Sequence, residues 1–198
     1  MEQKNSSSNL KKLIDIGISL SKEKNIDVLL EKILVEAKEI SNSDGGTVYL
    51  LSDNSRKLNF KIMHNESLKI HYGGSFEKVP SSIYPVRLYN DDKSQNLNNV
   101  AAVCALKAKT INIDDAYKND DFDFSGTKGF DQKYKYLSKS FLTIPLKNHK
   151  DKVIGVLQLL NPKKDGEIIS FSENLVELVE ALSSQASVAL TNQLLIDE

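Results

Sequence analysis

The chain has 198 residues with 26 basic and 27 acidic side chains, and this near balance excludes the strongly positive surface that nucleic acids require. No run of about 18 apolar residues is present to span a membrane, and the N-terminus lacks the apolar core of a signal peptide. The single cysteine, Cys104, excludes an internal disulfide framework and is typical of a reducing compartment. We therefore expect a cytoplasmic protein that contacts neither nucleic acid nor membrane.

Two helices are predicted near the N-terminus. Residues 1–9 are polar and predict a disordered tail. Apolar residues at helical spacing follow over 10–20 and again over 26–40, where Asn25 is a suitable N-cap. The apolar stripe of the second helix predicts that it packs on a sheet.

Strands and loops alternate in the middle of the chain. Residues 57–63 place Leu58, Phe60 and Ile62 on one face, which predicts a strand that forms a hairpin with 47–51. The same reasoning predicts loops over 64–82 and 161–167, an edge strand over 83–89, a small-residue helix over 98–109, and strands over 110–113, 140–146 and 153–160. Antiparallel strands flanked by terminal helices indicate an α+β domain.

The segment over residues 114–138 has no clear period, and a long irregular loop inside a compact domain usually serves binding. Asp131 lies within it and either accepts hydrogen bonds from a ligand or satisfies loop amides. The aromatic residues of this loop either pin it to the sheet or stack on a flat ligand. They are Tyr117, Phe122, Phe124, Phe130, Tyr134 and Tyr136.

The last predicted helix carries apolar residues at helical spacing and continues to Leu194. Ser170 and Glu173 fit a capping box at its start. Because no glycine or proline ends this helix, we expect residues 195–198 to be a truncated link to a missing output domain.

Several segments of the chain resemble the GAF domain, and in particular bacterial GAF domains upstream of cyclases, HD-GYP phosphodiesterases and related output modules. These segments are NVAAVCALKAKTINIDDAY, FDFSGTKGFD, SFLTIPLKNHKDKVIGVLQLLN and, more briefly, HNESLK, GGSF, PVRLY and ALSSQASVALTNQ. The resemblance implies one GAF domain over residues 10–194, with a PAS-related six-stranded antiparallel sheet. The terminal helices would cover one face of this sheet, and a ligand pocket would lie on the other.

The resemblance also implies where a small-molecule ligand would bind, namely at the start of the small-residue helix and in the loop before the last two strands. The ligand-binding residues that we predict are Arg87, Asn99, Val100, Ala101, Tyr117, Phe124, Phe130, Asp131, Tyr134, Ser138 and Thr143. The NKFDE signature of cyclic-nucleotide-binding members is broken here, because Pro162 follows Asn161 and Leu175 and Val176 replace the Asp-Glu pair. The broken pattern puts cyclic AMP and cyclic GMP in doubt as ligands. It leaves three alternatives: a cyclic nucleotide, another unidentified small molecule, or an empty pocket.

Catalysis and bound cofactors are not expected. A related branch of the family reduces free methionine sulfoxide with several cysteines, whereas Cys104 has no resolving partner and lies in an apolar helix. His64, His71 and His149 are scattered over separate loops, which predicts solvated side chains and no haem ligand.

A calcium site is not expected either. Asp121, Asp123, Ser125 and Gly126 imitate the opening of a calcium-binding loop, but its twelfth position is Gln132 and not the required glutamate. This segment is better read as an acidic solvated loop, so no metal is predicted.

These observations favour a non-enzymatic regulatory sensor of signal transduction. A ligand signal would pass through the terminal helices of a homodimer to an output domain. The alternative is a ligand-free dimerisation or interaction module with a vestigial pocket.

Overall fold

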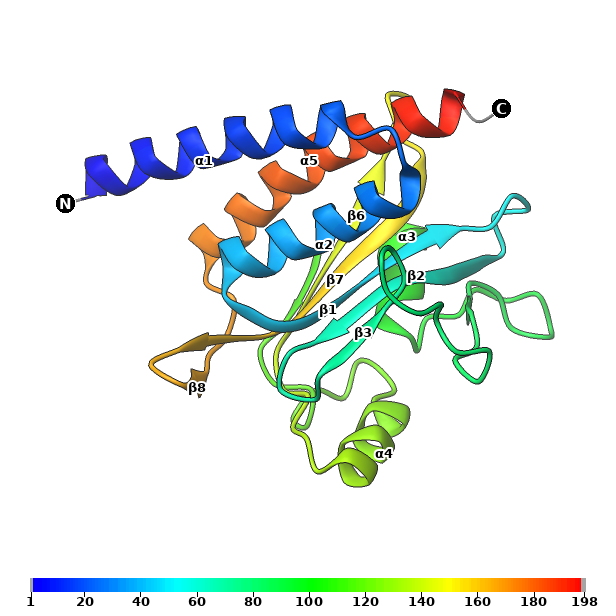
Figure 1. Cartoon of the computed structure of the whole chain (residues 1–198). Helices are drawn as coiled ribbons and strands as arrows, with labels where there is room; N and C mark the ends of the chain where they lie inside the picture. The colour runs from blue at the N-terminus through cyan, green and yellow to red at the C-terminus, as the bar shows by residue number, and fades with distance from the viewer. Residues whose placement is uncertain (1, 197–198) are drawn as a thin grey trace.

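The computed structural model describes residues 2–196, which form five helices and eight strands (Figure 1). The elements are α1 (Glu2–Lys22), α2 (Ile26–Ser41), β1 (Ser43–Leu51), β2 (Lys57–Asn65), β3 (Ile70–Tyr72), β4 (Val86–Arg87), α3 (Val100–Lys107), β5 (Ile111–Ile113), α4 (Ser125–Tyr134), β6 (Phe141–Lys147), β7 (Val153–Lys164), β8 (Glu167–Ile168) and α5 (Glu173–Ile196). The main path of the sheet has the order β3-β2-β1-β7-β6-β5, with β4 paired to β2 and β8 to β7. The strands of this path pair antiparallel, which confirms the expected α+β fold; the path has the six expected strands, and the short strands β4 and β8 bring the sheet to eight.

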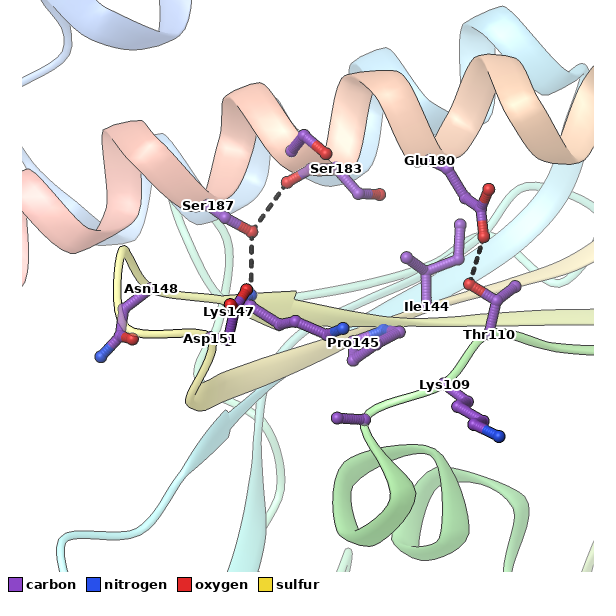
Figure 2. A pocket seen from close by; sticks show the side chains of 12 residues that line it. Lys109, Thr110, Ile144, Pro145, Lys147, Asn148, Asp151, Glu180, Ser183 and Ser187 are labelled. Carbon is purple, nitrogen blue, oxygen red and sulfur yellow. Dashed lines mark hydrogen bonds between the residues drawn. The ribbon is translucent and has the colours of Figure 1, made fainter.

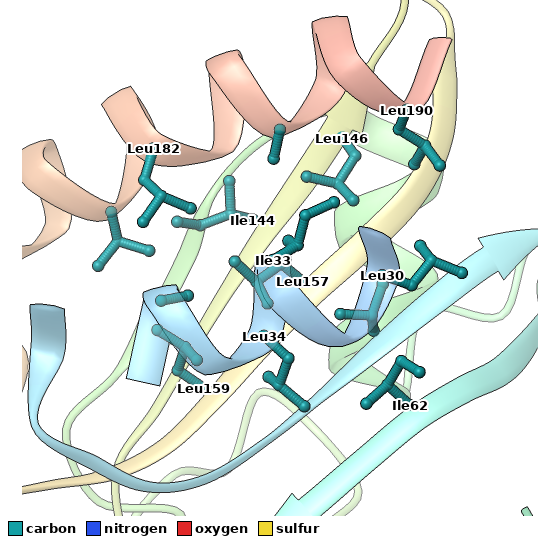
Figure 3. Close-up of a cluster of buried hydrophobic side chains, with 14 of the residues drawn as sticks. Leu30, Ile33, Leu34, Ile62, Ile144, Leu146, Leu157, Leu159, Leu182 and Leu190 are labelled. Carbon is teal, nitrogen blue, oxygen red and sulfur yellow. The ribbon is translucent and has the colours of Figure 1, made fainter. Parts of the chain in front are cut away.

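One face of the sheet is covered by the terminal helices, with α2 and α5 against the strands and α1 outside α5 (Figure 1). Alternate residues of the central strands point into this layer, for example Val48 of β1 and Leu157 of β7. Figure 3 shows how Ile33 and Leu34 of α2 meet these strands. Asn25 caps α2 by accepting hydrogen bonds from the backbone N–H groups of Asp27 and Val28, as the sequence predicts.

The opposite face carries α3, whose small residues let its backbone approach the strands. Ala101, Ala102 and Cys104 pack there with Tyr49 of β1 and Val156 of β7, residues of opposite parity to those that face the terminal helices. Helix α4 lies farther out on this side, beyond the end of β3 (Figure 1).

A bulge in β2 changes the face on which its residues lie. Val48 pairs with Ile62 but Tyr49 pairs with Phe60, so Lys61 is an extra residue in the ladder. Phe60 therefore lies on the α3 side beside Tyr49, with ring centroids 4.6 Å apart, while Ile62 joins the core under the terminal helices. The prediction that Leu58, Phe60 and Ile62 share a face is wrong for this reason.

Three predicted loops contain regular structure. Residues 114–138 include the helix α4, residues 64–82 include β3, and residues 161–167 include the end of β7 and the start of β8. The predicted edge strand over 83–89 is reduced to the two residues of β4.

The chain ends also differ in detail from expectation. The structure gives residues 2–9 as part of α1, where the sequence predicts a disordered tail, and Met1 lies outside the described residues. At the start of α5 the backbone N–H of Leu175 donates to Ser172 Oγ, so Ser172 and not Ser170 provides the cap contact. Of the predicted link, residues 195 and 196 extend α5 and residues 197–198 lie outside the described part of the chain. None of the helices between residues 2 and 196 combines the length and apolar character that crossing a membrane would need.

Candidate functional site

Two neighbouring cavities lie between the sheet and α4. The outer cavity has a volume of about 500 Å³ and the inner cavity about 70 Å³. Met63 of β2 and Phe130 of α4 line both of them, so the two cavities share these wall residues.

The outer cavity is lined mainly by apolar and aromatic side chains of β2, β3, α4 and the segment after β3. They include Phe60, Met63, Ile70, Tyr72, Pro80, Ile83, Phe130 and Tyr134. Phe130 and Tyr134 are one helical turn apart, and their ring centroids lie 4.5 Å from each other. This volume and lining are typical of a small-molecule site.

The inner cavity is smaller and has polar groups at its floor. Gln158 of β7 donates a 3.0 Å hydrogen bond from Nε2 to Thr143 Oγ1 of β6, and Tyr49 Oη donates to Gln158 Oε1 at 3.4 Å. Thr47 and Phe141 complete much of the wall. A volume of about 70 Å³ holds about two water molecules, so the inner cavity as formed admits only a small group of a ligand.

Asp131 fixes the end of α4 rather than facing either cavity with free oxygens. Its Oδ2 accepts from Tyr117 Oη and from the Ser138 backbone N–H, each at 2.7 Å, and its Oδ1 accepts from Ser138 Oγ at 2.7 Å. The hydrogen bond to this carboxylate raises the pKa of the Tyr117 hydroxyl. Of the two roles that the sequence left open, this geometry matches the one in which Asp131 satisfies its own loop.

The segment after α4 is anchored to the sheet through the buried carboxylate of Asp44 at the start of β1. Tyr136 Oη and Lys163 Nζ each donate to Asp44 at 2.5 Å, and Ser67 Oγ donates at 2.7 Å. Burial acts to raise the pKa of Asp44, but the hydrogen bonds from Lys163, Tyr136 and Ser67 outweigh it and lower the pKa. The carboxylate thus stays ionised and ties α4 to two central strands.

Asn161 of β7 strengthens the same anchor. Its Oδ1 accepts from the backbone N–H groups of Lys139 and Ser140, and its Nδ2 donates to Tyr136 Oη and to the Leu137 carbonyl. The prediction that Asn161 lies in a loop is wrong: it is a fully buried residue of β7. Its side-chain hydrogen bonds to the segment before β6 hold it there.

The predicted ligand-binding residues do not form one cluster. Phe130 and Tyr134 line the outer cavity. Thr143 accepts a hydrogen bond from Gln158, which lines the inner cavity. Arg87 lies elsewhere, in β4, where it forms a 2.7 Å ion pair with Asp91.

The remaining predicted residues hold the walls in place. Asn99 caps α3 by accepting from the Ala102 backbone N–H at 3.1 Å, and Ala101 packs on the sheet. Val100 and Phe124 join a buried cluster with Phe141. Tyr117 and Ser138 bind Asp131 as described above.

Sequence reasoning missed several residues that line the cavities, namely Thr47, Phe60, Met63, Ile70, Tyr72 and Gln158. Thr47 and Gln158 lie opposite each other in the ladder of β1 and β7. The alternation of inward and outward residues along these two strands could have predicted that both face the cavity side. Phe60 and Met63 required knowledge of the Lys61 bulge.

A larger cavity of about 690 Å³ lies on the other side of the molecule, between α5, β6 and the segment after α3 (Figure 2). Thr110 Oγ1 donates to Glu180 at 2.5 Å across it, and the Lys147 backbone N–H donates to Ser187 Oγ at 3.2 Å. None of the predicted ligand-binding residues lines this cavity, and several of its polar groups bind one another, so we regard it as a groove beside α5.

Two of the three histidines meet where β2 and β3 pair, and one of them is buried. His64 is buried beside His71 and Phe76, with ring centroids 4.8 Å and 5.5 Å away. His71 lies 3.3 Å from the Glu66 carboxylate, which also contacts Lys38 of α2. The expectation of solvated histidines fails for His64 because β2 and β3 pair residues that are seven positions apart.

The fold and the cavities define a pocket-bearing α+β domain with its terminal helices on the face opposite the pocket. The GAF domain family matches residues 25–190, so the chain belongs to this family, a class of regulatory domains in signalling proteins.

Relatives and solved structures agree with this assignment. The chain is 25% identical over 181 residues to a cGMP-specific 3',5'-cyclic phosphodiesterase of Drosophila mojavensis, covering 90% of this chain but only 15% of the relative. The GAF domain of an Acinetobacter phosphoenolpyruvate-protein phosphotransferase has a TM-score of 0.66 at 16% identity, over 96% of this chain and 97% of that chain. Free methionine-R-sulfoxide reductase of Neisseria meningitidis, solved in complex with its substrate, has a TM-score of 0.58 at 17% identity, over 95% of this chain and 93% of that chain.

Proposed function

We propose that the chain is a sensor domain that binds a small, flat molecule in the outer cavity. The observation that carries this proposal is the pair of cavities that share Met63 and Phe130 as wall residues. Rotation of the Phe130 side chain would join the two spaces, and a polar edge of the ligand would then meet Gln158 and Thr47. The aromatic rings of Tyr72 and Phe130 suit a planar ligand.

Transmission to an output domain would start at α4. A ligand under α4 shifts the segment that holds Tyr136, and Tyr136 contacts Asp44 directly after α2. Lys163 binds the same carboxylate near the end of β7, from which the chain runs through β8 into α5. Such coupling requires that the ligand bind one arrangement of α4 more tightly than another.

The ligand is not expected to be a cyclic nucleotide, although a relative of this chain is named as a cGMP-specific phosphodiesterase. The carboxylate of Asp131 is engaged by Tyr117 and Ser138, and the NKFDE pattern is broken after Asn161. Catalysis is not supported either, because burial raises the pKa of Cys104 to about 12 and leaves no reactive thiolate.

The second candidate function is a ligand-free dimerisation module. It is favoured by the small inner cavity and by the apolar residues Leu10, Ile14 and Ile18, which are exposed along one side of α1. In either case we propose a homodimer formed through α1 and α5.

Methionine methyl NMR would separate the two functions, because the chain has only two methionines and Met63 lines both cavities. We would label the methyl groups with carbon-13 and add cyclic nucleotides, amino acids including methionine sulfoxide, and planar heterocyclic acids. The sensor proposal expects one compound class to shift the Met63 signal and raise the melting temperature. The variant Met63→Leu assigns the signal, and Met1 serves as the internal control.

A specific result would decide against the sensor. If no compound moves the Met63 signal or the melting temperature, while the protein remains dimeric, the ligand-free module is the better description.

A further inference from the structure

We propose that His64, Glu66 and His71 form a binding site for a divalent transition-metal ion of the zinc class. His64 of β2 and His71 of β3 face each other in the antiparallel ladder, and Glu66 lies in the turn that joins the two strands. One ligand atom from each of the three side chains lies within 4.8 Å of the others. Lys38 and Glu31 of α2 lie near these groups, so the site faces the terminal helices. His64 also lines the inner cavity at α4, whereas none of the three side chains lines the outer one.

The spacing of the donor atoms is close to that of a metal site. Ligands bound to zinc at 2.0–2.2 Å in tetrahedral geometry are about 3.3 Å apart. His71 Nε2 lies 3.3 Å from each oxygen of Glu66, so this pair already has that separation. The ligand atom of His64 lies at most 4.8 Å from the other two. To bind the same ion it would have to move closer by about 1.5 Å at most, the difference between 4.8 Å and the spacing of about 3.3 Å between zinc ligands.

An unpartnered nitrogen on His64 is the independent observation that points to a ligand. His64 is only 3% exposed, and its Nε2 is buried without a hydrogen-bond partner among the described residues. Buried polar groups almost always have a partner, so such an atom requires an explanation. The rings of His71 and Phe76 pack against the His64 ring in edge-on geometry, with centroids 4.8 Å and 5.5 Å away.

The charges around the site include one cation that must be accommodated. Lys38 of α2 contacts Glu66 Oε1, which leaves Oε2 available to an ion. Glu31, also in α2, accepts hydrogen bonds from the Ser75 backbone N–H at 2.7 Å and from the Ser75 hydroxyl at 2.9 Å. Its carboxylate adds negative charge near His64. The carboxylates therefore outnumber the ammonium group beside the proposed site.

The donor set defines the class of metal. Two imidazoles and one carboxylate suit zinc, nickel or cobalt, whereas calcium and magnesium prefer oxygen ligands only. Three protein ligands leave a coordination position open for water or for a small anion. The partly exposed His71 and the exposed Glu66 provide a route of entry.

The test is a titration of the tag-free full chain with Zn²⁺ by calorimetry and with Co²⁺ by visible absorption. We expect one ion per chain and a Co²⁺ spectrum typical of nitrogen and oxygen ligands. His71→Gln and Glu66→Gln should each weaken binding by at least about tenfold. His149→Gln is the matched control, because it removes the only histidine outside the cluster and should leave the affinity unchanged.

Histidine ring NMR provides a second measurement in the wild-type chain. Addition of Zn²⁺ should shift the ring nitrogen signals of His64 and His71 and leave those of His149 in place. The proposal is overturned if the wild-type chain binds no Zn²⁺ at stoichiometric amounts, if His149→Gln abolishes binding, or if folded His71→Gln and Glu66→Gln bind as tightly as the wild type. His64→Gln is a further variant, but its buried position means that the two more exposed ligands carry the test.

Discussion

The Tyr136 hydroxyl donates a 2.5 Å hydrogen bond to the Asp44 carboxylate, although the two residues are 92 positions apart in the sequence. Tyr136 follows α4, and Asp44 lies at the start of β1. Asn161 donates a 3.0 Å hydrogen bond to the same hydroxyl. One side chain therefore connects α4 to two central strands, and the position of α4 determines the shape of both cavities.

Replacement of Tyr136 by phenylalanine tests this anchor. Tyr136→Phe removes the donor to Asp44 and leaves buried polar groups unpaired, so we expect unfolding free energy to fall by about 1–3 kcal/mol. Amide hydrogen exchange in α4 should accelerate more than in the central strands. Tyr134→Phe, at an exposed ring, is the control and should change neither quantity. Equal exchange in both variants would contradict the anchoring role.

The arrangement of helices and central strands could be predicted from the sequence because it depends on local apolar spacing. The apolar stripe of α2 runs from Ile26 to Ile40, and β6 and β7 are apolar runs. Both need burial, and they are buried against each other in one core cluster. The Lys61 bulge could not be predicted, since it depends on how β1 and β2 pair.

Helix α4 and the buried Asn161 were missed because their stability comes from tertiary contacts. Gly126 and Gly129 lower the helix propensity of α4, and only Phe130 and Tyr134 give it an apolar side. Asn161 has the composition of a loop residue, yet its side chain binds backbone groups of the segment before β6. The two histidines at the hairpin likewise become neighbours only through strand pairing.

Replacement of Asp131 by asparagine separates a structural role from a ligand-binding one. Asp131→Asn puts an NH₂ group against the donors Tyr117 or Ser138, so unfolding free energy should fall by about 1–3 kcal/mol in urea denaturation. Asp121→Asn, at an exposed position of the same segment, should be neutral. Unchanged stability with weaker ligand binding would instead support direct contact between Asp131 and the ligand.

The thiol of Cys104 is expected to be unreactive in the folded protein. Burial raises its pKa to about 12, and this lowers the thiolate fraction at pH 8 by about a thousandfold relative to a free cysteine. Reaction with a disulfide reagent should be at least about a hundredfold slower in buffer than in urea. Rapid reaction in buffer, with intact circular dichroism, would reopen the possibility of thiol chemistry.

Stability should depend on pH through His64. Burial, then Lys38 and His71, lower its pKa from 6.5 to about 4, while Glu31 and Glu66 act in the opposite direction. Below pH 6.5 the unfolded chain therefore binds a proton that the folded chain does not, and stability falls as pH decreases from 6.5 to 4, by up to about 3 kcal/mol.

Chemical denaturation in metal-free buffer between pH 7.5 and 4.5 measures this effect. The variant His64→Gln should lose most of the slope above pH 4.5, whereas His149→Gln should keep it. The same slope in all three proteins would assign the pH dependence to other groups.

The terminal helices are the expected site of dimerisation. Leu10, Ile14 and Ile18 of α1 are 60%, 50% and 48% exposed, and their spacing of four residues places them along one side of the helix. Val188 of α5 is 64% exposed as well. In a two-fold symmetric dimer formed through α1, these residues would be buried against the partner. Each subunit contributes the same surface, so a charge introduced at Ile14 enters the interface twice.

Ile14→Lys should therefore convert a dimer into a monomer in light scattering, with a dissociation constant raised by at least about a hundredfold, since each buried charge lacks a partner. Ile169→Lys also replaces an exposed isoleucine but lies outside the terminal helices, and it should leave the dimer intact. If Ile14→Lys remains dimeric while Ile169→Lys dissociates, the subunits associate through the β8 side of the molecule. A ligand signal would then need a different path, because α1 and α5 of the two subunits would not lie together.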